Sequence, residues 1–325
     1  MTLDYLDAKA EHDRLHERDM ESEKRALWSY ARHLERLGLT RFKAADLVLA
    51  FQGAGIGAVR RTVPFPNVCT HNGEKGLCHI FNYLTLLNEL LWFAMAELRE
   101  VQPGTLGFIC LHLHRCLPED ITDQLEYTYV LIHCVLAHHH CVVSVVVDYE
   151  MFQLYPALFS DALRQCTSLE RLHIGTSGWD FNEVGKLIVD VCTNCRLKEF
   201  TCSEIRLLGS GGEVQARFAD FLKTSTTLKV LSISNTTCCS NYEIVMGPLQ
   251  ANSTITVLRI DSACIELDNG AALSKFLSAN SVLVDLTLVK QSWHAPCNVG
   301  ILFKCLETNR VLQRLTLQRF SFTLT

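Results

Sequence analysis

The sequence predicts an α/β solenoid in which short parallel strands alternate with helices along the chain. Six segments in its second half repeat the pattern L-x-x-L-x-L, with first positions 28, 31, 27, 28 and 29 residues apart. An internal repeat of this length is typical of solenoids, which grow by stacking one unit on the next. The segments are Leu169-Leu172-Ile174, Leu197-Phe200-Cys202, Leu228-Leu231-Ile233, Ile255-Leu258-Ile260, Leu283-Leu286-Leu288 and Leu312-Leu315-Leu317.

A pair of apolar residues precedes each predicted strand, ten and six positions before its first residue. The two members are four residues apart and therefore share one face of a helix. Three positions before four of the strands is an asparagine, which tolerates the left-handed backbone expected where the helix ends. The pairs are Phe159/Leu163, Leu187/Val191, Phe218/Leu222, Val245/Leu249, Leu273/Leu277 and Leu302/Leu306, and the asparagines are Asn194, Asn252, Asn280 and Asn309.

The full unit, L-x-x-x-L-x-x-N-x-x-L-x-x-L-x-L, is most complete from Leu273 to Leu288. It resembles the ribonuclease-inhibitor type of leucine-rich repeat, which also occurs at the C-termini of NLR-type innate immune receptors. The resemblance covers roughly residues 100–325. It implies a horseshoe with a parallel sheet on the concave face and helices on the convex face. It does not imply one function, because a fold of this kind supports many activities.

Two features depart from that repeat type. In the family, an Asn or Cys usually follows each strand and forms a hydrogen-bonded ladder between turns, which we expect to be largely missing here. The glycine-rich loop after Leu197 also predicts an insertion. The residues at the ladder positions are Gly178, Ile205, Thr236, Ala263, Gln291 and Phe320, and the loop glycines are Gly209, Gly211 and Gly212.

Weaker repeats extend the predicted solenoid upstream, through Cys141-Ser144-Val146 and Leu106-Ile109-Leu111. We therefore expect leucine-rich repeats over 104–325, after a mainly helical region over 1–103. Within that region, apolar spacing predicts a helix over 21–37 that stops at Gly38 and a capping helix over 79–101, whereas 51–76 is predicted to be a loop. Few residues follow the last strand, so we expect the chain to be truncated.

Composition excludes some classes of partner. The net charge is −5 and there is no long run of Lys or Arg, so nucleic acid is not expected as a partner. The apolar stretch over 79–101 is interrupted by six Asn, Glu and Arg residues, so no membrane span is expected either. The charged segment from Asp4 to Lys24 lacks the apolar core of a secretory signal, which favours a cytoplasmic location.

The 15 cysteines are interpreted mainly as reduced core thiols. Several of them fall within predicted repeat helices or strands, as Cys166, Cys202, Cys264 and Cys305 do. Abundant reduced cysteine is also known in the ribonuclease-inhibitor class, so the resemblance implies sensitivity to oxidation.

Three local motifs have a chemical interpretation and a simpler structural one. The glycines at 53, 55 and 57 have the wrong spacing for a dinucleotide site. The C-x-x-C at 192–195 is explained by ordinary repeat architecture. Two sets of histidines and cysteines have ligands suited to zinc, but solvated or helix-capping histidines are favoured, so no metal, cofactor or catalytic site is expected. These sets are Cys110, His112, His114 and Cys116, and His133, Cys134, His138, His139, His140 and Cys141.

The outward residues of the predicted strands are the candidate site. They combine both signs of charge with small polar and β-branched side chains, which suits a protein surface. We therefore expect a protein-interaction scaffold without catalysis, whose partner the sequence does not identify. The alternatives are the substrate-recognition subunit of a ubiquitin ligase, a small-GTPase regulator and a fragment of an immune receptor. The candidate residues are Glu170, Arg171, His173, Lys198, Glu199, Lys229, Arg259, Asp285 and Arg314 on the strands, with Trp179 and Trp293 in nearby loops.

Overall fold

A computed structural model shows two units, Met1–Val142 with Met151–Cys166, and Val143–Glu150 with Thr167–Thr325. The described residues are 29, 32, 34–38, 69, 77–111, 122–175, 187, 189–192, 196–203, 212–234, 242–262, 270–290, 299–307 and 309–320.

The second unit is built from parallel strands that follow one another in chain order. Each predicted L-x-x-L-x-L segment contains a strand, so all six predicted strands are confirmed, and β3 confirms the weaker repeat before them. The strands are β3 (Val142–Val147, whose first residue belongs to the other unit), β4 (Arg171–Ile174), β5 (Glu199–Ser203), β6 (Val230–Ser234), β7 (Val257–Asp261), β8 (Asp285–Val289) and β9 (Arg314–Gln318).

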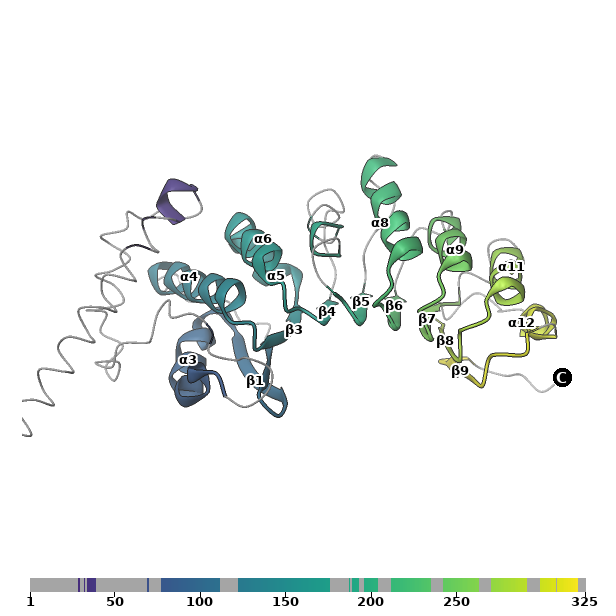
Figure 1. Ribbon diagram of the computed structural model, residues 1–325, viewed down its shortest axis with the longest axis horizontal. Coiled ribbons are helices and arrows are strands. Elements are labelled where there is room, and N and C mark those ends of the chain that lie inside the picture. The colour runs from purple at the N-terminus through teal and green to yellow at the C-terminus, as the bar shows by residue number, and fades with distance from the viewer. Residues whose placement is uncertain are drawn as a thin grey trace, which may run out of the picture. The chain divides into compact units, whose positions relative to one another are not determined.

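Helices of the second unit lie on the opposite side from its strands (Figure 1). The helices α8 to α12 pack against their neighbours in chain order, and the residues described near 187–192 are also helical. The fold is thus an α/β leucine-rich-repeat solenoid, as predicted. The helices are α8 (Gly212–Thr224), α9 (Tyr242–Ala251), α11 (Ala271–Ala279) and α12 (Val299–Leu306).

The core of the second unit consists of equivalent leucine positions in register. Leu231 pairs with Leu258, and Leu258 pairs in turn with Leu286. All three side chains are fully buried. Burying a leucine contributes about 1.5–3 kcal/mol relative to leaving it exposed, so the repeated positions stabilise the array one unit at a time.

A ladder of asparagine side chains joins successive repeats at the point where each helix leads into its strand. Asn252 Oδ1 accepts hydrogen bonds from the backbone N–H groups of Thr254 and Ile255, at 2.8 and 2.9 Å. Its Nδ2 donates to the carbonyls of Leu222 and Ser225 in the preceding repeat, at 2.8 and 3.1 Å. The side chain therefore satisfies backbone groups on both sides of the repeat boundary.

Asn280 and Asn309 repeat this arrangement. Each Oδ1 accepts from the backbone N–H groups two and three residues later, at 2.8–3.0 Å. Asn309 Nδ2 donates to the Leu277 carbonyl at 2.7 Å, and Asn280 Nδ2 lies 3.5 Å from the Asn252 carbonyl. We call Asn252, Asn280 and Asn309 the asparagine ladder.

The sequence-based reason for these asparagines was wrong. Asn280 has φ −82° and ψ 126°, which is extended backbone and needs no left-handed conformation. The asparagine is required for its side-chain amide, which offers an acceptor and a donor at once. A ladder between repeats therefore exists just before the strands. Of the six positions where it was sought, only Phe320 is described.

The first unit combines a β-hairpin with packed helices. The strands β1 (Ala96–Gln102) and β2 (Thr105–Cys110) pair antiparallel. They are joined through Gly104, whose φ of +78° is readily adopted only by glycine. The helical segments are η1 (His79–Tyr83), α3 (Leu84–Leu91), η2 (Trp92–Ala94), α4 (Thr122–His138), α5 (Tyr149–Leu154, which begins in the other unit) and α6 (Pro156–Gln165).

The predicted helix over 79–101 is correct from His79 to Ala94 and wrong from Ala96 onward. Helical structure ends at Ala94, Met95 takes a left-handed conformation with φ +51°, and β1 follows. Asn88 fixes this reversal, because its side chain donates to the Leu98 carbonyl at 2.9 Å and accepts from the Leu98 N–H at 2.7 Å. The strand prediction around Leu106 is confirmed by β2.

Parts of the predicted helix over 21–37 are described, and residues 32 and 34–36 are helical. Leu34 is fully buried, whereas Leu37 is 51% exposed. Gly38 ends the helix as predicted, with φ +66°. Among the described residues, no helix has the length and apolar content that a membrane span requires. The domain boundary at 103/104 stays a prediction.

We expect Asn252→Ala to lower the free energy of unfolding by about 2–4 kcal/mol, because it leaves two N–H and two C=O groups without their partner. The Asn252→Asp variant replaces the donor with a buried carboxylate facing the Leu222 and Ser225 carbonyls, so at neutral pH it should be destabilised at least as much as Asn252→Ala. Urea unfolding measures both, with Lys275→Ala on the exposed face of α11 as the control. Equal midpoints for Asn252→Ala and Lys275→Ala would contradict the role of the ladder.

Candidate functional site

The strand face of the second unit is the surface formed by side chains that point away from the buried leucines. Side chains alternate along a strand, and the parallel register therefore aligns equivalent outward residues in rows. One row consists of Arg171, Glu199, Val230, Val257, Asp285 and Arg314, and the next of His173, Thr201, Ser232, Arg259, Thr287 and Thr316.

A third row lies just before the strands. It is held by backbone hydrogen bonds of 2.7–3.0 Å, in which each residue donates its N–H to the carbonyl of the equivalent residue one repeat earlier. This row consists of Glu170, Lys198, Lys229, Thr256, Val284 and Gln313.

Charges lie at the two ends of the first row and an apolar pair lies at its centre. Val230 and Val257 are directly paired and partly exposed. Beyond Val257, Arg314 Nη1 lies 3.2 Å from Asp285 Oδ2. In the third row, Lys198 Nζ lies 2.5 Å from Glu170 Oε1. The first row thus presents an apolar pair between charged residues, with the exposed cations Lys229 and Arg259 in the rows on either side.

Nine of the eleven residues predicted to bind a partner are described, and the structure brings these nine together on the strand face. Lys198, Lys229, Arg259 and Arg314 are exposed, and the others are partly exposed. Arg171 is partly covered, and its Nε and Nη2 have no hydrogen-bond partner in the described part of the chain. The predicted rim residues Trp179 and Trp293 lie outside the described residues. Partner binding by these residues stays a prediction.

A groove of about 590 Å³ lies beside α8 and is lined by residues that include Cys192, Arg196, Asp220 and Thr224. At its edge Arg217 Nη2 donates to Asp190 Oδ1 at 3.3 Å. The lining is mixed polar and apolar and the groove is open, so its described residues do not form a set of converging catalytic groups.

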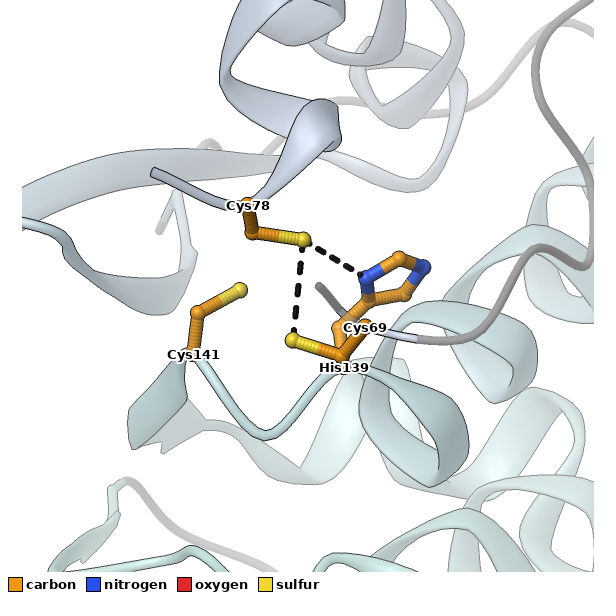
Figure 2. Close-up of side chains that lie close together, drawn as sticks. All are labelled: Cys69, Cys78, His139 and Cys141. Atoms are coloured by element: carbon orange, nitrogen blue, oxygen red, sulfur yellow. Dashed lines mark hydrogen bonds between the residues drawn. The ribbon is translucent and has the colours of Figure 1, made fainter. Parts of the chain in front are cut away.

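Three cysteines and one histidine of the first unit converge on one point (Figure 2). Cys78 Sγ lies 3.6 Å from Cys69 Sγ and 3.3 Å from His139 Nδ1. Together with Cys141 Sγ, these atoms all lie within 4.8 Å of one another. We call Cys69, Cys78, His139 and Cys141 the CCHC cluster.

The CCHC cluster is enclosed by protein. Cys78, His139 and Cys141 are at most 2% exposed, and Cys69 is partly buried. The ring of His79 lies beside that of His139, with centroids 5.3 Å apart. Burial and the neighbouring His139 lower the pKa of His79, whereas Cys69 acts in the opposite direction and raises it. The pKa of the Cys141 thiol lies far above its ordinary value. The causes, largest first, are a hydrogen bond with the Cys69 side chain, burial and the nearby Cys78.

The structure regroups the two histidine and cysteine sets found in the sequence. His139 and Cys141 join Cys69 and Cys78, which the sequence interpretation placed in or next to a loop and missed. His133 instead pairs with Asp161, with Nε2 and Oδ2 2.8 Å apart. The Cys134 thiol is buried, and burial raises its pKa.

Several other members of these sets, and most residues of the other motifs, lie outside the residues that the structure describes. Cys110 is a buried residue of β2, whereas His112, His114 and Cys116 lie outside the described residues, as do the glycines at 53–57. Cys192 is buried, but Cys195 is not described. A missed signal for the cluster was the H-x-C spacing of His139 and Cys141, two residues apart at the end of α4.

No protein-family model matches the chain, and no curated protein matches it. Among solved structures, it is similar to leiomodin-1 actin-binding site 2, with 21% identity and a TM-score of 0.32, over 45% of this chain and 83% of that one. It is also similar to the leucine-rich repeat-containing protein LegL7 from Legionella pneumophila, with 13% identity and a TM-score of 0.39, over 60% of each chain. At these scores the likenesses carry no argument about function.

The charged residues of the strand face should matter little for folding. Lys198 and Arg314 have side chains 59% and 74% exposed, and exposed ion pairs contribute about 0–1 kcal/mol. We therefore expect Lys198→Ala and Arg314→Ala each to change the free energy of unfolding by less than about 1 kcal/mol. Urea unfolding checks this, and a loss as large as that of Asn252→Ala would show that these side chains are structural.

Proposed function

We propose that this chain is a protein-binding scaffold without catalytic activity, and that its strand face holds the partner. The observation that carries the proposal is the first row, in which the apolar pair Val230 and Val257 lies between charged residues at both ends. Protein interfaces have this organisation, with an apolar centre and a polar rim.

The size of the strand face supports a macromolecular partner. The strands β4 to β9 are consecutive neighbours, and a spacing of about 4.8 Å between strands makes the face about 24 Å across. A surface of this width can hold a folded domain or a long peptide segment.

The charges of the strand face indicate the chemistry of the partner. Its predicted binding residues include five cations, Arg171, Lys198, Lys229, Arg259 and Arg314, and three anions, Glu170, Glu199 and Asp285. The excess of two cations favours a protein with carboxylates around an apolar centre. It is small compared with the dense positive charge that a nucleic-acid backbone requires, so nucleic acid is not proposed.

The proposal also places the protein in the cytoplasm. The eight cysteines whose side chains are described have free thiols, and seven of them are buried, which suits a reducing compartment. Membership of the ribonuclease-inhibitor subtype, suggested by the repeat pattern, is part of the same proposal. The asparagine ladder supports a repeat of fixed geometry but does not identify a subtype.

The test is a pull-down with four exposed cations of the strand face reversed together, namely Lys198→Glu, Lys229→Glu, Arg259→Glu and Arg314→Glu. Reversal places like charges against an acidic partner and removes rim attraction. We expect the recovery of the proteins that the native chain captures to fall about tenfold or more. Quantitative mass spectrometry of the captured proteins measures the effect.

The matched control reverses four exposed cations on or beside the helices, Lys223, Lys275, Lys304 and Arg310. It changes the net charge by the same amount but leaves the strand face intact. Thermal unfolding confirms that both variants are folded. Equal recovery from the strand-face variant and the control would refute the proposed surface.

Two outcomes would favour another function. Capture of a cullin adaptor that survives both changes would favour the ubiquitin-ligase alternative, and stimulated GTP hydrolysis would favour regulation of a GTPase.

A further inference from the structure

We propose that the CCHC cluster binds one zinc ion through Cys69 Sγ, Cys78 Sγ, His139 Nδ1 and Cys141 Sγ. This site is separate from the strand face and goes beyond the proposed binding function. All four residues belong to the first unit, so the site is formed within one part of the molecule.

The distances between the ligand atoms fit a tetrahedral zinc ion. With Zn–S bonds of about 2.3 Å and a Zn–N bond of about 2.0 Å, tetrahedral geometry places two sulfurs about 3.8 Å apart and a sulfur and a nitrogen about 3.5 Å apart. The distance between Cys69 Sγ and Cys78 Sγ is 3.6 Å, and that between Cys78 Sγ and His139 Nδ1 is 3.3 Å. Small rotations of the side chains would complete the geometry.

The types of ligand favour zinc and a structural role. Three thiolates and one imidazole in tetrahedral array form one of the common structural zinc sites, and soft sulfur ligands disfavour calcium, magnesium and manganese. Four protein ligands leave no open position for water or substrate. Binding would release the protons of the three thiols to solvent, with no change of oxidation state.

The ligands are held in place by backbone hydrogen bonds around the cluster. Cys69 N–H donates to the His138 carbonyl at 3.3 Å, and Leu106 N–H donates to the Cys141 carbonyl at 2.7 Å. Val142 N–H donates to the His139 carbonyl at 2.9 Å. Nδ1 of His139 faces the sulfur of Cys78, while the other ring nitrogen points away from it (Figure 2). The arrangement therefore presents the ring nitrogen that a metal would use.

The proposed ion would join segments that are far apart in the sequence. Cys69 and Cys78 come before α3, whereas His139 and Cys141 lie between α4 and β3. Zinc bonds to Cys69 and Cys78 on one side, and to His139 and Cys141 on the other, would tie these two segments together. Ordinary packing of thiols in a core accounts for single buried cysteines such as Cys134. It gives no reason for three sulfurs and an imidazole nitrogen to meet at one point.

The first experiment uses the full native chain and needs no variant. Protein purified under reducing conditions from cells grown with added zinc should contain about one zinc per chain by elemental analysis, as expected for one four-ligand site. After removal of the metal, added Co²⁺ should give sulfur-to-cobalt charge-transfer bands and the intense visible bands of tetrahedral cobalt. Folded protein that contains no zinc and gives no such spectrum would overturn the proposal, and so would stoichiometric iron.

The second experiment compares Cys78→Ala with Cys134→Ala. Both cysteines are free and almost fully buried, and both variants lose one thiol, but only Cys78 belongs to the cluster. We expect Cys78→Ala to lose the bound zinc and the cobalt spectrum, and Cys134→Ala to keep both. Equal metal content in the two variants would contradict the assignment.

A chelator distinguishes loss of metal from loss of fold. EDTA should lower the thermal unfolding midpoint of the native chain and of Cys134→Ala, while leaving that of Cys78→Ala unchanged, because that variant has no metal to lose.

Mass spectrometry without reductant tests whether the neighbouring thiols form a disulfide instead. A Cys69–Cys78 disulfide found throughout protein isolated with its thiols blocked at lysis would replace the zinc site.

Discussion

The side-chain amide of each ladder asparagine, which is buried at Asn252 and Asn280 and partly exposed at Asn309, is the interaction on which the repeat architecture depends. One side chain binds the N–H groups that begin its own strand and a carbonyl of the preceding repeat. This double role fixes how far each strand lies from the helix of the previous unit. A buried amide has no alternative partner in a leucine core, so a shift in register would leave backbone groups unsatisfied. The leucines supply most of the stability, and the asparagines select one register.

Because these requirements are periodic, the part of the fold that repeats could be predicted from the sequence. All six strands were found from leucine spacing alone. The reversal after Ala94 was not, because the stretch around Leu98 has apolar residues at helical spacing, while the competing signal is a tertiary hydrogen bond from Asn88. The role of Asn280 was also misjudged, since one of its partners, the Asn252 carbonyl, lies in the preceding repeat. Local pattern reveals which residues are buried but not which distant backbone groups they bind.

The strand face and the CCHC cluster also differed in how far the sequence predicted them. The outward residues of the strand face were predictable because each lies at a fixed offset from a core leucine. The CCHC cluster was only half visible, since His139 and Cys141 are neighbours in sequence but Cys78 lies 61 residues before His139. Chain separation of this size has no local signature. The repeats are thus suited to contacts over a broad surface, whereas the CCHC cluster in the first unit brings a few side chains together at one site.

The antiparallel hairpin of the first unit affects how copies of this protein behave in solution. Among the described residues, β1 is the terminal strand in the sheet order. A strand edge left free can recruit another chain, but the Asn88 side chain already occupies the N–H and the carbonyl of Leu98 in β1. The sequence of β1 places Glu97, Arg99 and Glu100 along that edge, with Glu97 and Arg99 paired to each other. A second copy would have to desolvate these charges in order to add a strand. In the described part of the chain, this edge is thus occupied at Leu98 and charged beside it, which disfavours the addition of a strand from a second copy at β1.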